Sequence, residues 1–197
     1  MVYINRSQLE PKITICIPVY EQTKLLDATL YNISKSEFRA VIDHDLVLCI
    51  AKQSVVLNRL ACLAHSRTDL ILWLDDDVEF RCAGWDLYLH HIIASDPTIG
   101  AVGINVVHHK SKDLSPERKA GDVNEVCGAA FITRQIDGIK FDPIYQGSQF
   151  EDTDYCFQLK RAGYRVVQDN GLHVIHHNTM KNANNVNAHL FKEKWGL

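Results

Sequence analysis

Residues 69–77 read DLILWLDDD, an apolar run that ends abruptly in three aspartates. A run without polar alternation predicts a strand that is covered on both faces, as in parallel sheets. Two further runs have the same character, Ile13–Ile17 (ITICI) and Asp45–Ala51 (DLVLCIA). The spacing of apolar residues predicts helices over about 22–35 and from Val55 to Leu63. Strands that alternate with helices predict an α/β fold with a mostly parallel, doubly wound, Rossmann-like sheet and helices on both faces.

The rest of the chain continues this pattern without an internal repeat or a linker, which favours one domain over 1–197, with a core at about 12–177. The C-terminal tail, 178–197, is rich in asparagine, and we expect only Leu190–Trp195 to dock. The further elements that the pattern predicts are a helix at Trp85–Ala94, a strand at Ile99–Val107, a mobile polar loop at 108–122, a strand at Val123–Thr133, a helix at Asp152–Ala162 and short strands at Tyr164–Gln168 and Leu172–Ile175.

The composition is that of an ordinary globular protein, with 46% hydrophobic and 23% charged residues and a formal net charge of -3 at pH 7. This charge gives no general attraction to nucleic acid or to anionic membranes. The polar start lacks the apolar core of a signal peptide, and the longest apolar runs are too short to span a bilayer. The six cysteines are scattered without a C-x-x-C pair, which favours reduced thiols. We therefore expect a cytoplasmic protein without a transmembrane segment.

Asp75, Asp76 and Asp77 form the first group that could carry chemistry. Ligands of open α/β sheets bind beyond the carboxyl ends of the strands, where this apolar strand delivers the three acids. Oxygen ligands of this kind suit Mn²⁺ or Mg²⁺, which keep positions free for substrate phosphates. Strand alternation turns Asp75 and Asp77 to one side, so we favour Asp77 as a direct ligand and Asp75 near a ribose or a bridging water. The alternative is a solvated acidic turn that caps the next segment.

Glu151, Asp152 and Asp154 open a later helix and form the second group. Capping of the helix start explains one acid comfortably and three acids less well. In the functional interpretation Asp152 is a general base near an acceptor hydroxyl, and Glu151 and Asp154 flank or brace it.

The third group is HVIHH, which contains His173, His176 and His177. An imidazole can complete a metal site that carboxylates hold. Because His173 and His176 point to opposite faces of an extended chain, at most one joins the site, and we favour His176. A lone histidine is more often structural, and for His108–His109 we expect no metal role.

These three groups follow one another in a fixed order along the chain, and in that order the chain resembles the family 2 glycosyltransferases, whose catalytic domains have the nucleotide-sugar-binding GT-A fold. The segments that carry the resemblance are ITICIPVYEQTKLLDATL, VLNRLACLAHSRTDLILWLDDDVEF, GAAFITR, FEDTDYCFQLKRAGYR and HVIHH. They are similar to the opening strand, the approach to the D-x-D metal motif, the acceptor-side strand, the E-D-x-D helix and the terminal histidine segment of that family. The chain departs from the family at Lys52-Gln53-Ser54, where a D-N-x-S loop is common, and at Gln158, where an arginine is frequent.

The resemblance implies a single GT-A catalytic domain with a small antiparallel part on the acceptor side. It implies transfer of a sugar from a nucleoside-diphosphate sugar to a hydroxyl of a carbohydrate or other acceptor, with inversion and with Mn²⁺ or Mg²⁺ as cofactor. The residues then expected at the nucleotide are Pro18, Val19, Tyr20, Glu21, Lys52, Arg59, Asp75 and Asp76. For Lys52 and Arg59 a place on a helix surface is an equal alternative. The loop 108–122 would order over the bound donor.

Two other functions stay open. A relic that binds sugar nucleotides without transferring the sugar would carry the same donor residues. A nucleotidyltransferase also joins a doubly wound sheet to acidic metal ligands, but it normally has a Gly-rich, basic loop after the first strand. The corresponding segment here, PVYEQTK, has neither glycine nor arginine.

Overall fold

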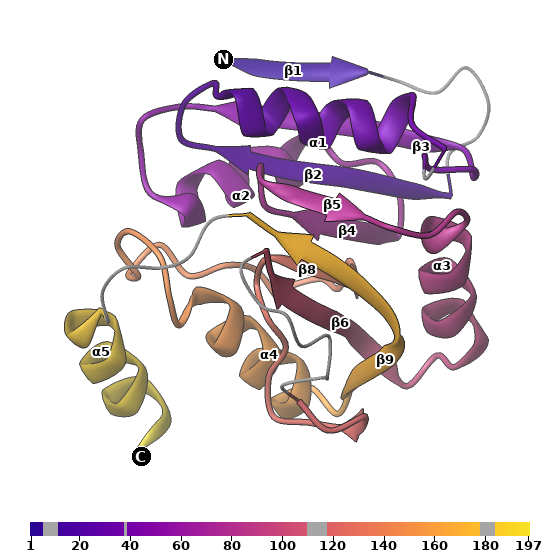
Figure 1. The fold of residues 1–197 in the computed structure, drawn as a ribbon. Coiled ribbons are helices and arrows are strands. Elements are labelled where there is room, and N and C mark those ends of the chain that lie inside the picture. Colours follow the sequence, from indigo (N-terminus) through magenta and orange to yellow (C-terminus); the bar gives the residue numbers. More distant parts are fainter. Residues whose placement is uncertain (6–11, 38, 110–117, 178–183) are drawn as a thin grey trace.

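The computed structural model describes residues 1–5, 12–37, 39–109, 118–177 and 184–197, and these form one nine-stranded sheet with helices packed on it (Figure 1). The strands are β1 (Val2–Asn5), β2 (Ile13–Val19), β3 (His44–Ile50), β4 (Leu70–Leu74), β5 (Val78–Phe80), β6 (Ile99–His108), β7 (Gly121–Asp122), β8 (Ala130–Arg134) and β9 (Arg165–His176). The helices are α1 (Lys24–Ser34), α2 (Val55–His65), α3 (Trp85–Ser95), α4 (Glu151–Arg161) and α5 (Asn185–Trp195).

The sheet is mixed, with a parallel majority at its centre. The strand order is β1-β3-β2-β4-β8-β6-β9-β5, and β7 pairs with β9 outside this path. Strand β2 is parallel to β3 and β4, and β6 is parallel to β9. Because β8 is antiparallel to both β4 and β6, the strands β3, β2, β4, β6 and β9 all run in one direction. The predicted α/β fold class is confirmed.

Helices cover both faces of the sheet, which explains the uninterrupted apolar run of β4. Every residue of β4 is buried. Leu72 belongs to the core formed with α1 and α3, whereas Trp73 belongs to the core formed with α2 and α4. On the first face Trp85 of α3 stacks on Phe80, with ring centroids 3.8 Å apart. Successive residues of a strand point to opposite faces, so a strand buried on both sides must be apolar throughout.

Three expectations about the strands were wrong in detail. The strand that begins at Ile13 continues through Pro18 to Val19, because β4 pairs with β2 only at Thr14–Cys16 and leaves the proline without a second neighbour. The strand expected over Val123–Thr133 is confined to Ala130–Arg134. The short strands β1 and β5 were not predicted.

The two short strands expected after the late helix form one long strand, β9. Its pairing with β6 shifts between Gly103 opposite Gln168 and Asn105 opposite His173. The extra residues of β9 form a bulge that includes Asn170-Gly171, a pair typical of turns, so the sequence suggested a break where the strand only bends.

The C-terminal segment docks over more of its length than predicted, since α5 covers Asn185–Trp195. Phe191 and Trp195 of α5 pack against Phe157 of α4, with ring centroids 5.0 and 5.3 Å away. The expected mobile lid over 108–122 falls largely on 110–117, which lie outside the described residues. Within the part of the chain that the structure describes, no helix has the length and apolar character needed to cross a membrane.

Candidate active site

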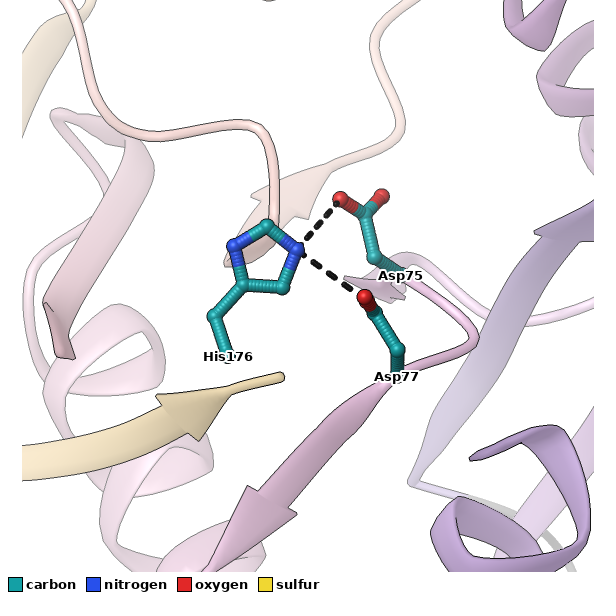
Figure 2. Close-up of side chains that lie close together, drawn as sticks. All are labelled: Asp75, Asp77 and His176. Atoms are coloured by element: carbon teal, nitrogen blue, oxygen red, sulfur yellow. Dashed lines mark ion pairs between the residues drawn. The ribbon is translucent and has the colours of Figure 1, made fainter. Parts of the chain in front are cut away.

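Two carboxylates and one imidazole meet where β4 ends. The chain leaves β4 at Leu74 and enters β5 at Val78, which pairs opposite His176 at the end of β9. His176 Nε2 therefore lies 3.0 Å from Asp77 Oδ1 and 3.7 Å from Asp75 Oδ2 (Figure 2). The ligand atoms of the three residues lie within 4.8 Å of one another. The structure thus brings together Asp77 and His176, which the sequence favoured as metal ligands, with Asp75, which it placed beside them.

The charges of this group favour a bound cation. Burial raises the pKa of Asp75 above its usual range, although Arg59 and His176 oppose the shift. Burial and the neighbouring carboxylates raise the pKa of Asp76 to about 6. Burial alone would lower the pKa of His176, but its hydrogen bond to Asp77 and the nearby carboxylates raise it overall. A divalent cation would remove the repulsion among the acids, and two hard oxygen ligands with one imidazole fit Mn²⁺ or Mg²⁺.

Three further histidines, His108, His109 and His177, lie close to His176 but do not belong to the metal group. The ring of His108 lies 5.8 Å from that of His176, and the ring of His109 lies 5.6 Å from that of His177. His177 Nε2 is 3.1 Å from Glu79 Oε2. Both residues line a different cavity, beside α1. The pairs lie side by side because the last residues of β6, Asn105–His108, pair in register with His173–His176 of β9.

Asp152 lies in the first turn of α4 and lines a cavity with the metal group. Its Oδ1 accepts a hydrogen bond from the Thr153 N–H at 2.8 Å. Burial raises the pKa of Asp152, and the charge of Arg59 only partly opposes this. Gly128 permits the close approach, since a Cβ at that position would lie 2.6 Å from Asp152 Oδ2. A half-buried carboxylate with a raised pKa, facing a cavity, is suited to accept a proton.

Glu151 is held by a buried arginine. Arg59 Nη1 donates to Glu151 Oε1 at 3.2 Å, and Arg59 Nη2 donates to the carbonyl of Gly128 at 2.9 Å. The same Nη2 lies 3.6 Å from Asp75 Oδ1, so one guanidinium reaches both acid groups. Arg59 is 2% exposed, which rules out the alternative of a role on a helix surface.

Asp154 lies apart from the two cavities and joins α4 to α5. It is fully buried and accepts hydrogen bonds from the Tyr145 hydroxyl at 3.2 Å and the Trp195 indole N–H at 2.8 Å. Lys194 Nζ lies 2.9 Å from the same carboxylate, and Gln158 donates to it at 2.7 Å. These contacts support a structural role. Capping accounts for one acid only: the N-cap residue Phe150 makes no side-chain capping bond, and Asp152 Oδ1 accepts the Thr153 N–H of the first turn.

Two adjoining cavities form one cleft along the carboxyl ends of β2 and β4. The larger has a volume of about 800 Å³ and the smaller about 270 Å³. Both are lined by Val55, Asp75, Asp76 and Ser148. The smaller cavity also contains Asp77, Asp152 and His176, the three positions that the sequence placed around one pocket.

The residues predicted at the nucleotide do not all face this cleft. Pro18 and Tyr20 line the larger cavity. Val19 is fully buried in the sheet core, so the prediction that its side chain lines the nucleotide pocket finds no support in its position. Glu21 and Lys52 pair with each other at 3.0 Å on the surface, and neither is among the residues that line the two cavities.

Sequence reasoning missed several residues of the cleft. Asn58 is buried and donates through Nδ2 to the carbonyls of Val19 and Ala51, at 2.9 and 3.0 Å. Its Oδ1 accepts a hydrogen bond from Gln53 at 2.7 Å. An asparagine among the apolar residues of α2 was the available signal. The other missed residues of the larger cavity are Ser54, Val55, Leu57, Pro143, Gln146, Gly147 and Ser148.

Gln149 lines the smaller cavity, and it and Phe150 adopt a rare backbone conformation. Their φ angles are 77° and 69°, in the left-handed region that favours glycine. Each such residue costs about 1–3 kcal/mol and persists only where its surroundings hold it. No pattern in the sequence predicts these positive φ angles.

The sequence matches no protein-family model. No curated protein matches it either. Solved structures do match the chain, and three of them contain a bound nucleotide or nucleotide sugar. The mannosyltransferase PcManGT from Pyrobaculum calidifontis, in complex with GDP-Man and Mn²⁺, has a TM-score of 0.64 and 16% identity over 90% of this chain and 60% of that chain. GalNAc-T7 with UDP, GalNAc and Mn²⁺ has a TM-score of 0.68 and 12% identity over 94% of this chain and 48% of that chain.

The S. aureus TarS 1-349 structure in complex with UDP-GlcNAc has a TM-score of 0.64 and 11% identity over 87% of this chain and 60% of that chain. This chain therefore spans about half to three fifths of the length of these three structures. At such low identity the likeness concerns the fold alone. The chain shares its fold with nucleotide-sugar glycosyltransferases of the GT-A type.

Proposed function

We propose that this chain is a metal-dependent, inverting glycosyltransferase of the family 2 kind, which moves a sugar from a nucleoside-diphosphate sugar to an acceptor hydroxyl. One observation carries the proposal. The carboxylates of Asp75 and Asp77, the imidazole of His176 and the half-buried Asp152 line a single cavity that opens into a larger one. A single catalytic domain over 1–197 is part of the proposal, supported by the one continuous sheet of the described residues.

The larger cavity would hold the nucleoside. Its volume of about 800 Å³ lies in the range of small-molecule sites. Tyr20 and Pro18 offer apolar surface to a base, while Asn58 fixes the amide of Gln53 at the wall. Gln53 stands where the family commonly has an aspartate loop, so an uncharged amide would replace a carboxylate in reading the base or ribose.

Asp77, Asp75 and His176 would hold Mn²⁺ or Mg²⁺ beside the diphosphate. A bound cation supplies charge neutralisation for the leaving diphosphate. Arg59 adds a fixed positive charge behind Asp75, at 3.6 Å, and limits the repulsion among the acids. Of the residues predicted at the nucleotide, Asp76 lines both cavities and can contact either the ribose or the phosphates.

Asp152 would take the proton of the acceptor hydroxyl. The acceptor oxygen attacks the anomeric carbon, the bond from that carbon to the diphosphate oxygen breaks, and the nucleoside diphosphate leaves. Attack opposite to the leaving group inverts the configuration. Glu151 would hold Arg59 in place rather than exchange a proton with the acceptor, because its Oε1 is bound to the guanidinium.

The test uses UDP-N-acetylglucosamine and GDP-mannose as probes, with Mn²⁺ or with EDTA. We expect slow release of UDP or GDP even without an acceptor, and loss of the release in EDTA. Asp77→Asn should weaken the Mn²⁺-dependent binding of the nucleoside diphosphate about 100-fold, on the order of what loss of a metal-shell partner costs, as calorimetry can measure.

Asp137→Asn, a matched change at an exposed turn, should leave that binding unchanged. Full turnover in EDTA, or unchanged binding in Asp77→Asn, would contradict the metal assignment. Tight binding of the nucleotide without any release or transfer would instead identify a protein that only binds sugar nucleotides.

A further inference from the structure

The residues 146–150, here called the wall loop, separate the two cavities and lead directly into the acidic start of α4. Positions 146–148 line the larger cavity, and positions 148–149 line the smaller one. Because Asp152 follows the loop after only one intervening residue, the path of the wall loop decides where the carboxylate of Asp152 stands.

The wall loop needs external support. Gln149 and Phe150 both have positive φ angles, a conformation that residues with a side chain seldom adopt. Such a conformation persists where neighbouring groups over-determine it. Neighbouring groups must therefore hold this loop.

Asn187, in the first turn of α5, supplies much of that support. It is fully buried, and its Nδ2 donates to the carbonyls of Gln146, Ser148 and Gln149 at 3.0, 3.2 and 2.9 Å. Its Oδ1 accepts a hydrogen bond from the Gln146 N–H at 3.2 Å. One side chain thus contacts the backbone at both ends of the loop.

Asn184 adds a second set of contacts. Its Nδ2 donates to the carbonyls of Gln146 and Ser148 at 2.9 and 3.1 Å. Its backbone N–H donates to Gln149 Oε1 at 2.6 Å. At the same time its Oδ1 caps α5 by accepting the Asn187 N–H at 3.1 Å.

The rest of α5 is fastened on both sides of the wall loop. Lys194 pairs with Asp142, ahead of the loop, at 2.7 Å and with Asp154, behind it, at 2.9 Å. Phe191 packs against Phe150, with ring centroids 5.5 Å apart. The helix is therefore a brace that spans the loop rather than a tail that merely touches the domain.

We propose that Asn187 and Asn184 are positioning residues, which hold the wall loop in its strained conformation and thereby place Asp152 at the donor cleft. This inference rests on the function proposed above. Neither asparagine lines the cleft, so both act through the backbone of the loop.

The test compares two variants with a matched control on the same helix. Asn184→Asp keeps the oxygen that caps α5 and removes the amide that donates to the loop. Asn187→Asp replaces the amide that donates to three carbonyls. Asn185→Asp makes the same change in charge at an exposed neighbour.

For each protein the turnover of UDP-N-acetylglucosamine or GDP-mannose is measured with Mn²⁺, together with the stoichiometry of UDP or GDP binding and hydrogen exchange in 146–150. We expect kcat to fall about 30-fold to 100-fold in Asn187→Asp, the scale of a misplaced catalytic group. The donor KM should rise by less than kcat falls, because the metal group comes from other elements and positions 146–148 form only part of the wall of the larger cavity. The binding stoichiometry should not change, exchange in the loop should accelerate, and Asn184→Asp should show the same pattern more weakly.

Wild-type kcat in both variants would overturn the inference, as would unchanged hydrogen exchange in the loop. A fall in kcat that is matched by an equal fall in binding stoichiometry would also overturn it, since that result indicates misfolded protein. If the wild-type chain turned over neither donor, the proposed function would fail. Accelerated exchange in the variants would then still support the bracing of the loop, so the two failures are distinguishable.

Discussion

The two acid-bearing segments of this protein, Asp75–Asp77 and Glu151–Asp154, use their carboxylates in different ways. In the second segment, Glu151 and Asp154 each face a permanent cation, at 3.2 and 2.9 Å. In the first, the closest partner is His176, whose charge depends on protonation. Among the described residues Asp152 forms no ion pair with a lysine or arginine. Glu151 and Asp154 are held by a fixed cation, whereas Asp77 and Asp152 line the smaller cavity without one. Asp75 combines both features, since it lines the cleft and lies 3.6 Å from Arg59 Nη2.

This difference explains why a run of acids is a poor guide to function when it is read residue by residue. Asp152 and Asp154 are two positions apart, yet one lines the smaller cavity and the other is fully buried against α5. On a helix, two positions apart means nearly opposite sides. The comparison predicts that changes in the two kinds of carboxylate and in their partners have different consequences.

The largest effect should come from Asp152→Asn. An amide cannot accept the proton of an acceptor hydroxyl, so we expect kcat to fall about 1000-fold, within the range for loss of a general base. Binding of UDP or GDP with Mn²⁺ should change by less than about twofold, because Asp152 is not needed to hold the nucleotide. Steady-state kinetics and calorimetry on the same preparation measure both.

Asp137→Asn is a suitable control for this experiment, being an exposed aspartate in a turn. Asp86 on α3 would be an unsuitable control. It is buried and accepts hydrogen bonds from the Val41 and Ile42 N–H groups at 2.6 and 2.8 Å. A wild-type kcat in Asp152→Asn would exclude this carboxylate as the group that takes the proton of the acceptor hydroxyl.

Arg59→Met should mainly affect stability. At pH 8, where Glu151 is mostly ionised in the wild type, the change leaves this carboxylate buried without its cation, which typically costs about 3–5 kcal/mol in the free energy of unfolding. Arg81→Met removes an exposed ion pair with Glu79 and should cost less than about 1 kcal/mol. Urea unfolding of the two variants gives the comparison directly. Equal losses of stability would mean that the buried pair has no special role.

The third prediction concerns pH. Burial and the charge of Asp152 raise the pKa of Glu151 from 4.5 to about 7. The carboxyl group of Glu151 therefore binds a proton more tightly in the folded than in the unfolded state. The contribution of this protonation to the free energy of unfolding is complete below pH 4.5 and is lost as the pH rises towards 7. The shift corresponds to about 3 kcal/mol.

Glu151→Gln cannot titrate, and it isolates this contribution. The difference in unfolding free energy between wild type and Glu151→Gln should shift against the wild type by about 3 kcal/mol between pH 4.5 and 7. Denaturant unfolding at several pH values, with EDTA present throughout, measures it. Parallel pH profiles for the two proteins would show that Glu151 keeps an ordinary proton affinity.

Much of the fold could be predicted because its central strands are buried on both faces. The apolar run of β4 and the helical spacing in α1 and α2 are local signals, and the observed bounds differ by few residues from the expected ones. The strand β1 was missed because it is short and mostly exposed. The bulge in β9 imitates a turn, since its Asn170-Gly171 pair is also typical of turns.

The cleft could be predicted only where strand ends reveal it. Asp75, Asp77 and His176 each follow or end a strand, so their meeting could be expected from topology. The pairing of Arg59 with Glu151 joins residues 92 positions apart, and no spacing in the sequence encodes it. The support of the wall loop by Asn187 joins residues 38 positions apart, and it depends on where α5 docks.

The three tryptophans of the chain lie in the two core layers and in α5, which packs against one of those layers. Trp73 of β4 is in the core between the sheet and helices α2 and α4. Trp85 of α3 is in the core on the other face of the sheet. Trp195 is in α5, close to Phe157. Variants that retain one indole at a time would therefore give a separate intrinsic fluorescence signal for each core layer and for α5. Loosening of the C-terminal helix could then be followed in real time apart from melting of either core, with no added dye.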